Sequence, residues 1–265
     1  MNKSTEGPRK RRPPTGNREV LYGYHPVTEA LRAGKRTIYT LMVDRREKST
    51  RQERLVALAQ QRKIQPQRSN SEQIRSVAGN GQHQGVAAIV SPLPTESLAS
   101  LLSRSQKKGR SCLLVLLDGI VDPNNLGAVV RTAHCVGADG LVIPKDRAVG
   151  AIPAVSKASA GALEHSRLCR VTNLSATLQS LKKKGVWVGG LAMEGEQTLF
   201  QADLTGSLAL VIGGEEKGLR PLVKQQCDFL VRIPLFGRVD SLNASAAASV
   251  ALYETLRQRL KQEER

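Results

Sequence analysis

The hydrophobic pattern in the first third of the chain alternates between helical and strand periods. Apolar positions three and four residues apart are typical of helices, whereas short apolar runs rich in β-branched residues are typical of strands. These patterns predict a small α/β domain over residues 20–91, with helices at 25–33, 51–62 and 71–75 and strands at 37–43 and 85–90.

Two polar or proline-containing stretches follow this domain. Ser91-Pro92-Leu93-Pro94 and the run 105–110 enclose one short apolar segment, which predicts a helix at 95–102. Such stretches neither continue a helix nor fill a core. We therefore interpret residues 92–111 as a linker.

From residue 112 onward, short apolar runs of strand length alternate with longer segments of helical period. The predicted strands are 112–117, 141–143, 186–189, 208–212 and 229–233, and the predicted helices are 126–136, 152–162, 174–184, 219–226 and 243–262. This alternation is typical of βαβ units, in which helices cover both faces of a parallel sheet. We expect a second α/β domain over residues 112–265.

The net charge of the chain indicates the class of molecule that it binds. It carries 40 Lys and Arg residues against 23 Asp and Glu residues, which gives a formal net charge of +17 and an isoelectric point near 10.2. Such an excess indicates a polyanionic partner, usually a nucleic acid. Because aromatic residues make up only 3% of the chain, contacts of Arg and Lys with a nucleic-acid backbone are favoured over a surface of base-stacking rings.

Residues 1–19 are predicted to form a basic, disordered arm. Up to Arg18 they hold six basic residues against Glu6, with three prolines and almost no apolar side chain. A segment of that composition cannot bury a core. Such a segment is equally compatible with an arm that binds RNA phosphates and with a solvated tail that has no ligand.

The four cysteines lie far apart and form no C-x-x-C pair. The sequence therefore predicts neither a zinc site nor a disulfide framework, but buried free thiols in a reducing cytosol. No metal ion is expected. No apolar run is long enough to span a membrane and no secretory signal is present, so the expected location is the cytoplasm.

Ligands in open α/β sheets bind beyond the carboxyl ends of the strands, and three predicted strand ends carry unusual sequence. The first is residues 118–133, where a helix starts near Asn125 and Arg131 lies nearly two turns into it. Asn125 also suits a simple N-cap, and a lone Arg in a helix is more often just solvated. Taken by itself, this segment is moderately specific evidence for a ligand site.

The second strand end, residues 210–219, contains the neighbouring Gly213 and Gly214. Adjacent glycines let a ligand approach the backbone closely, although they equally suit a plain turn. Neither this segment nor residues 79–85 fits the G-x-G-x-x-G dinucleotide pattern, and no P-loop spacing occurs. An enzyme of the standard NAD or ATP kind is therefore disfavoured.

The third strand end, residues 233–243, runs from Ile233-Pro234-Leu235 through a turn to Ser241-Leu242-Asn243. The helix that follows begins with small residues at 243–249, which suit close packing against another helix or a second subunit. A capped helix with a tight core contact explains these small residues but not the whole sequence of residues 233–243.

Together the three segments resemble the SpoU branch of the SPOUT superfamily, RNA 2′-O-ribose methyltransferases that use S-adenosylmethionine. The matching strings are N-x-G-A-x-x-R-T-A at 125–133, I-G-G-E-x-x-G-L at 212–219, and I-P followed by S-L-N-A-S at 233–245, in the family's order and spacing. The segments 23–27 and 83–86 are similar to the substrate-binding extension of the ribosomal-RNA members. Only the basic arm lies outside the resemblance.

This resemblance implies a C-terminal parallel-sheet SPOUT domain with a trefoil knot, preceded by a small α/β substrate-binding domain. It also implies a homodimer whose active sites lie at the subunit interface, with S-adenosylmethionine as cofactor. The expected cofactor-binding residues, including a wall after the strand at 186–189, are Gly213, Gly218, Ile233, Leu242, Leu191 and Gly195.

The resemblance further implies a catalytic set consisting of Arg131, Asn125, Glu215, Ser241 and Asn243. A ribose 2′-hydroxyl is a poor nucleophile, so it must be aligned with the methyl group and helped to lose its proton. Because a guanidinium keeps its proton, we expect Arg131 to bind the target phosphate and stabilise the developing alkoxide, while a phosphate oxygen or Glu215 accepts the proton. Asn125 and Asn243 would orient these groups, with help from Ser241.

Three histidines need separate interpretation. His134 and His165 fall in predicted packed helical segments and are expected to be structural, whereas His83 is a candidate RNA contact.

The expected substrate is a guanosine of large-subunit (23S) ribosomal RNA, because the extra N-terminal domain is often missing from transfer-RNA relatives. Three alternatives stay open from the sequence: a transfer-RNA methyltransferase, an adenosine-methylating sibling, and a non-catalytic RNA-binding ribosome-assembly factor on the same scaffold. Retention of the catalytic set argues against the last alternative.

Overall fold

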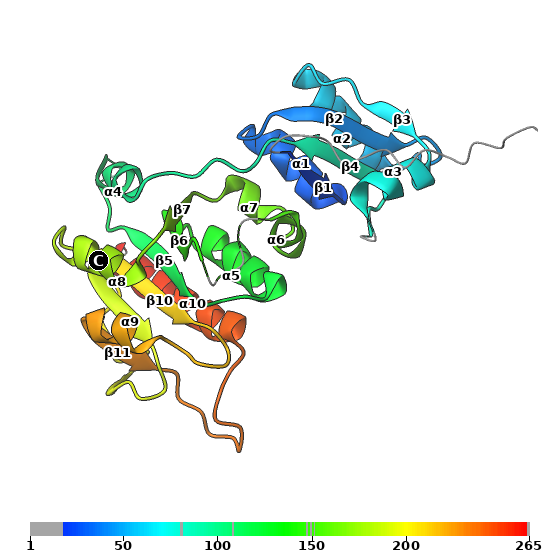
Figure 1. Cartoon of the computed structure of the whole chain (residues 1–265). Helices are drawn as coiled ribbons and strands as arrows, with labels where there is room; N and C mark the ends of the chain where they lie inside the picture. Colours follow the sequence, from blue (N-terminus) through cyan, green and yellow to red (C-terminus); the bar gives the residue numbers. More distant parts are fainter. Residues whose placement is uncertain are drawn as a thin grey trace, which may run out of the picture.

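The computed structural model describes residues 18–79, 82–107, 109–146, 148, 150 and 152–263, which form two α/β units, each with its own sheet (Figure 1). The predicted basic arm lies almost wholly outside these residues. Within the described ranges, no helix combines the length and the apolar character needed to cross a membrane.

The first unit is a four-stranded sheet with helices on both faces. Its strand order is β1-β4-β2-β3, with bounds Glu19–Tyr22, Val86–Val90, Ile38–Asp44 and Gln67–Ser69. Its helices are α1 (Tyr24–Ala33), α2 (Thr50–Gln61) and α3 (Ser71–Ala78). Leu41 and Val43 face the core beneath α1 and α2, whereas Met42 between them packs with Ile74 of α3. The alternation along β2 therefore builds a core on each face.

The second unit contains a seven-stranded sheet in which every neighbouring pair is parallel. The strand order is β7-β6-β5-β10-β8-β11-β9, with bounds Leu168–Val171, Gly140–Pro144, Leu113–Asp118, Leu208–Gly213, Trp187–Leu191, Phe229–Arg232 and Gln197–Thr198. The expected α/β class and parallel C-terminal sheet are confirmed.

Helices cover both faces of this sheet, as the alternating pattern predicted. The helices are α4 (Leu98–Lys107), α5 (Pro123–Cys135), α6 (Pro153–Ala158), α7 (Ala162–His165), α8 (Leu174–Lys182), α9 (Pro221–Gln226) and α10 (Ala244–Glu263). In β5, Val115 and Leu117 belong to the core under α5, α6, α7 and α10, whereas Leu114 and Leu116 belong to the core under α4, α8 and α9. Such continuously apolar strands are typical of a sheet buried on both sides.

Several predicted elements differ from the structure. The strands β1, β3, β7 and β9 were not predicted, because each is short and lacks a strong apolar run. The single helix expected at 152–162 is broken into α6 and α7, since Ala160 and Gly161 adopt the left-handed region with φ of 52° and 86°.

Helix starts and one cysteine need smaller corrections. Asp122 caps α5 through the backbone N–H of Asn124, so the helix begins before Asn125. Asn70 caps α3 in a reciprocal capping box with Gln73, and the helix extends to Ala78, beyond the predicted end at residue 75. The four cysteines are free, and Cys112 and Cys169 are buried as expected, but Cys135 is exposed on α5 and Cys227 is only half-buried.

The strand order reverses beside β5. From β5 the chain moves outward to β6 and β7, and it then returns to place β10 and β8 on the other side of β5. The carboxyl ends of β5 and β10 therefore adjoin at a topological switch point, where α/β sheets bind ligands.

Paired polar groups join the two units where α1 lies against α7. Arg36 and Glu164 form an ion pair of 2.6 Å between Nε and Oε2, with side chains 0% and 1% exposed. Lys35 donates to the backbone oxygens of His165 and Ser166, and His165 pairs with Glu29 at 2.8 Å. We call the contact of Glu29, Lys35 and Arg36 with Glu164 and His165 the interdomain seam.

Candidate active site

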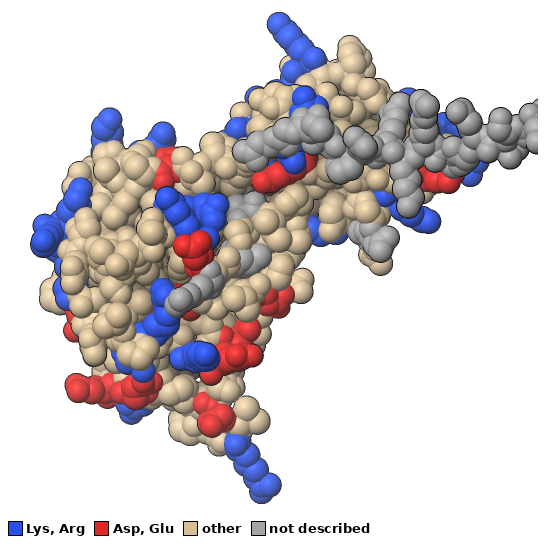
Figure 2. Space-filling view, in the orientation of Figure 1, with Lys and Arg blue, Asp and Glu red and all other residues tan. Residues whose placement is uncertain are grey.

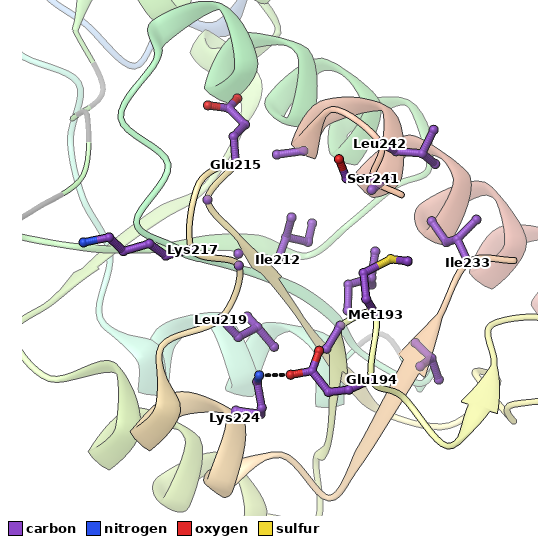
Figure 3. Close-up of a pocket in the computed structure, with 18 of the residues that line it drawn as sticks. Met193, Glu194, Ile212, Glu215, Lys217, Leu219, Lys224, Ile233, Ser241 and Leu242 are labelled. Atoms are coloured by element: carbon purple, nitrogen blue, oxygen red, sulfur yellow. Dashed lines mark hydrogen bonds and ion pairs between the residues drawn. The ribbon is translucent and has the colours of Figure 1, made fainter. Parts of the chain in front are cut away.

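A cavity of about 270 Å³ lies at the carboxyl ends of β8, β10 and β11 (Figure 3). Three segments form its walls: the residues after β8, the glycine turn after β10, and the connection from β11 to α10. Most of the lining side chains are apolar, and they include Leu191, Met193, Ile212, Leu219, Val231, Ile233, Leu235 and Leu242. Cavities with apolar walls and a few polar groups are typical of cofactor sites.

The glycine turn after β10 has no room for side chains at its first two positions, Gly213 and Gly214. A Cβ on Gly213 would lie 2.2 Å from the carbonyl carbon of Gly218, and one on Gly214 would lie 2.5 Å from the oxygen of Gly119. Gly218 itself has a φ of +58°, which favours glycine. These glycines let the turn fold back on itself and expose backbone to the cavity.

An ion pair fixes this turn to the end of β5. Asp118, which is 1% exposed, accepts hydrogen bonds from the backbone N–H of Arg220 at 2.8 Å and from its Nε at 2.6 Å. The backbone N–H of Gly214 also donates to the backbone carbonyl oxygen of Asp118. Asp118 thus positions both ends of the glycine turn, one through its buried carboxylate and the other through its backbone.

Asn125 connects all three sequence motifs. Its Nδ2 donates to Glu215 and, at 3.0 Å, to Asp122, while its Oδ1 accepts from Nδ2 of Asn243 at 3.0 Å. Both donor hydrogens of the amide and one acceptor position are therefore used. Figure 3 shows Glu215 pointing from the glycine turn toward α5.

Asn243 has a second role at the start of α10. Its Oδ1 accepts from the backbone N–H of Ser245 at 2.9 Å and of Ala246 at 3.3 Å, as a helix N-cap does. The small residues that follow pack partly inside the chain, since Ala244 and Ala248 are buried and Ser249 contacts the hydroxyl of Thr132 on α5.

Three of the predicted catalytic residues are exposed at the cavity: Glu215, Ser241 and Asn243. We call them the active-site rim. Glu215 and Ser241 also line the cavity, and Asn243 follows directly after Leu242. This arrangement places acceptor and donor groups where a second substrate would meet a molecule bound in the cavity.

Arg131 does not join this cluster within the chain. Six residues of α-helix separate it from Asn125 by about 9 Å along the axis and turn it to a different side. Arg131 is exposed and makes no hydrogen bond or ion pair with another described residue. It is therefore available to a ligand that the chain alone does not supply.

Sequence comparison accounts for both units. Residues 112–253 match the SpoU rRNA methylase family, and residues 20–96 match the RNA 2′-O ribose methyltransferase substrate-binding family. The chain belongs to the SpoU rRNA methylase family. It is a methyltransferase of this family with the substrate-binding domain in front of the catalytic one.

Relatives match over nearly the whole chain. The 23S rRNA (guanosine-2′-O-)-methyltransferase RlmB of Coxiella burnetii is 41% identical over 90% of this chain and 95% of its own length. The SpoU methyltransferase AviRb of Streptomyces viridochromogenes, solved in complex with the cofactor AdoMet, is 26% identical with a TM-score of 0.78, over 92% of this chain and 91% of that one.

A transfer-RNA enzyme of the same family matches less of the chain. The A. aeolicus TrmH/SpoU tRNA modifying enzyme has a TM-score of 0.52 and 25% identity, and the match covers 62% of this chain and 86% of that one.

The cofactor-binding residues predicted for a SpoU enzyme gather around one cavity, with one exception. Leu191, Gly213, Gly218, Ile233 and Leu242 all line it. Gly195 is not among the lining residues; a Cβ there would lie 2.7 Å from the backbone of Val231. Gly195 therefore lets the loop after β8 pack against β11.

Sequence reasoning missed two charged pairs of this SpoU site. Lys224 of α9 pairs with Glu194, and its hydrogen bond lowers the pKa of the Glu194 carboxyl. Asp118 and Arg220 form the second pair. A charge directly after an apolar strand was the available signal for Asp118, but its partner lies 102 residues away and no local pattern identifies it.

The two histidines predicted to be structural lie together beside the interdomain seam, although His134 is exposed on α5 and not packed as predicted. The rings of His134 and His165 stack with centroids 5.5 Å apart. Among the described residues, no group of three or more His, Cys, Asp or Glu side chains is placed to hold a metal ion.

Proposed function

We propose that the chain transfers a methyl group from S-adenosylmethionine to the ribose 2′-hydroxyl of a guanosine in 23S ribosomal RNA. The observation that carries this proposal is the Asn125 cluster, in which three separate family motifs converge through hydrogen bonds beside an apolar cavity. The nearly full-length match to the Coxiella relative supports the choice of RNA and nucleotide.

The first unit favours ribosomal over transfer RNA. The transfer-RNA enzyme covers 62% of this chain, whereas the Coxiella ribosomal-RNA enzyme covers 90%. The substrate-binding match at residues 20–96 accounts for much of that difference. A separate RNA-binding unit suits recognition of a large folded RNA beyond the nucleotide that reacts.

The cavity residues suit S-adenosylmethionine. Leu191, Ile233 and Leu242 offer apolar surface for an adenine ring, and the glycine turn offers backbone groups that side chains would otherwise cover. Lys224 and Glu194 offer charges of both signs for the cofactor's amino-acid and hydroxyl groups. When bound, the cofactor supplies a methyl group on a positively charged sulfur, which is already a good electrophile.

The rim residues prepare the ribose oxygen. Asn125 holds one oxygen of Glu215 through its amide, and Oε2 of Glu215 has no partner among the described residues. That oxygen can accept the 2′-hydroxyl proton directly or share the task with an RNA phosphate. Ser241 and Asn243 orient the ribose, while the Arg131 guanidinium binds the phosphate and stabilises the developing alkoxide.

A homodimer explains the position of Arg131. Helix α10 exposes Val250, Tyr253 and Leu260, which are 37%, 53% and 50% exposed and fall on one helical stripe. An apolar stripe of this kind is typical of a subunit contact. In such a dimer, Arg131 of one copy serves the cavity of the other. A trefoil knot through the cavity loops and a cytoplasmic location complete the proposal.

Radiolabelled S-adenosylmethionine tests this function directly. The purified chain should label 23S rRNA transcribed in vitro and leave transfer RNA unlabelled, and the labelled guanosine should resist alkaline cleavage because its 2′-oxygen is blocked. Label on transfer RNA would favour the alternative substrate. Label on a base, or cofactor binding without transfer to any RNA, would overturn the proposal.

A further inference from the structure

The connection from β11 to α10 carries a phenylalanine that no described residue covers. Every residue from Phe236 to Asn243 is exposed, and Phe236 is 99% exposed. A Cβ on the neighbouring Gly237 would meet only the backbone nitrogen of Val239, at 4.0 Å. A benzyl side chain fully in water forgoes the burial that phenylalanine normally gains. The ring is therefore placed for a partner outside the chain.

Residues near the two ends of this connection indicate that Phe236 lies close to the cofactor cavity. Leu235, directly before Phe236, and Ser241 both line the cofactor cavity. In Figure 1 the connection projects away from the sheet. Phe236 therefore directly follows a residue of the cavity lining and lies in the same connection as Ser241 of the active-site rim.

Transfer to a ribose in the cavity would leave the base of that nucleotide without its stacking partners. A ribose can approach the cavity only if its nucleotide leaves its neighbours in the RNA, so its base loses stacking partners. Proteins that bind such exposed bases commonly stack them on an aromatic ring. None of the residues lining the cavity is aromatic, so the lining itself offers no such ring.

We propose that Phe236 is the stacking platform for the base of the target nucleotide. The inference rests on the proposed function and deepens it, because it assigns a residue that holds the base while the rim orients the ribose. Arg238 in the same turn supplies a cation for the adjoining phosphate, although Asp240 partly offsets its charge. Stacking accepts any base, so Phe236 contributes affinity and positioning and leaves the choice of guanosine to other contacts.

Substitutions of Phe236 separate an aromatic role from a merely apolar one. With 23S rRNA transcript as substrate, Phe236→Leu should raise KM for RNA roughly ten- to hundredfold, whereas Phe236→Trp should stay within a few fold of the wild type. Affinity for S-adenosylmethionine, measured by calorimetry, should not change. Phe200→Leu is the matched control, because Phe200 is 55% exposed and lies outside the cavity lining.

An abasic substrate tests the contact itself. A short hairpin containing the mapped guanosine is compared with one in which that nucleotide keeps its ribose but lacks a base. The wild type should lose about as much efficiency on the abasic hairpin as Phe236→Leu loses on the normal one. The variant should then lose little more from base removal, because both changes delete the same contact.

Other outcomes overturn the assignment. An unchanged KM in Phe236→Leu, or additive losses with the abasic hairpin, would show that the ring does not touch the base. A lower molar mass of the variant in light scattering, with RNA affinity unchanged, would assign Phe236 to a second copy of the chain. If the wild type itself methylates no guanosine of 23S rRNA, it is the proposed function that fails, and the two failures are distinguishable.

Discussion

The interdomain seam and the active-site rim use similar polar side chains in opposite ways. In the seam, Arg36 and Glu164 are almost completely buried and satisfy one another at 2.6 Å, with a further bond of 2.8 Å from Ser156 to Glu164. At the rim, Glu215 and Asn243 are exposed and only partly used by the chain. The buried charges of the interdomain seam are paired within the chain, whereas the active-site rim keeps polar groups that a ligand can use.

This difference distinguishes residues that stabilise the fold from residues whose polar groups stay available to bind substrate. A buried charge that loses its partner costs several kcal/mol, because the remaining charge is left unpaired in a medium of low dielectric constant. An exposed polar group costs the fold almost nothing when it is removed. Substitutions in the seam should therefore act on stability, and substitutions around the rim should act on methyl transfer.

The largest expected effect is at Arg131. Arg131→Ala should lower methyl transfer to 23S rRNA about a thousandfold, because alkoxide stabilisation by a positioned cation is lost. Since Arg131 has no partner among the described residues, its removal should leave the free energy of unfolding within about 0.5 kcal/mol of the wild type. Initial rates and urea denaturation of the same preparation check both parts. Near-wild-type methylation with normal RNA binding would remove Arg131 from the catalytic set.

The next effect is at Glu164 and falls on stability. Glu164→Ala should lower the free energy of unfolding by about 3 kcal/mol, because Arg36 keeps a buried charge with fewer partners. Glu194→Ala removes a partner from the more exposed pair with Lys224 and should cost less than about 1 kcal/mol. Denaturation curves without cofactor give both values. Equal losses would mean that burial does not distinguish the two ion pairs.

Asn243 stands between the two classes, since it caps α10 and also donates to Asn125. Asn243→Asp keeps the capping oxygen but cannot donate, so it should lower methyl transfer about tenfold and keep the stability. Asn243→Ala should lose activity and about 1 kcal/mol of stability. Rates and melting curves of the two variants separate the roles. An active Asn243→Asp would show that the bond to Asn125 is dispensable.

The smallest effect is a pH dependence at His134. Partial burial, reinforced by the neighbouring His165, lowers the pKa of His134 below its ordinary value of 6.5. The unfolded chain therefore binds a proton that the folded chain does not, so stability is lost as the pH falls below about 6.5. His134→Gln should remove part of this loss, shifting the melting temperature at pH 5.5 by only about one degree. Identical pH profiles for both proteins would exclude this contribution.

The sequence predicted the core layers better than the connections. Continuous apolar strands such as β5 and β10 carry a strong signal, because they are buried on both faces. The break between α6 and α7 was invisible, since Ala160 is a good helix former and takes its left-handed conformation from tertiary context. Short edge strands such as β9 likewise depend on the strand beside them.

The same distinction applies to the candidate site. Motif residues such as Asn125, Glu215 and Asn243 were found because each motif is recognisable locally, and the structure shows that they touch. The seam was not predicted, because Arg36 and Glu164 are 128 residues apart and no local pattern links them. Likewise, the full exposure of Phe236 follows from the three-dimensional course of its loop.

The most direct test of the central claim removes one oxygen from the substrate. A hairpin with the mapped guanosine is compared with the same hairpin carrying 2′-deoxyguanosine at that position, each with labelled S-adenosylmethionine. If the ribose 2′-hydroxyl is the acceptor, the deoxy substrate should bind with similar affinity and accept no methyl group. Equal labelling of both hairpins would place the methyl group elsewhere on the nucleotide and contradict the proposed 2′-O-methyl transfer.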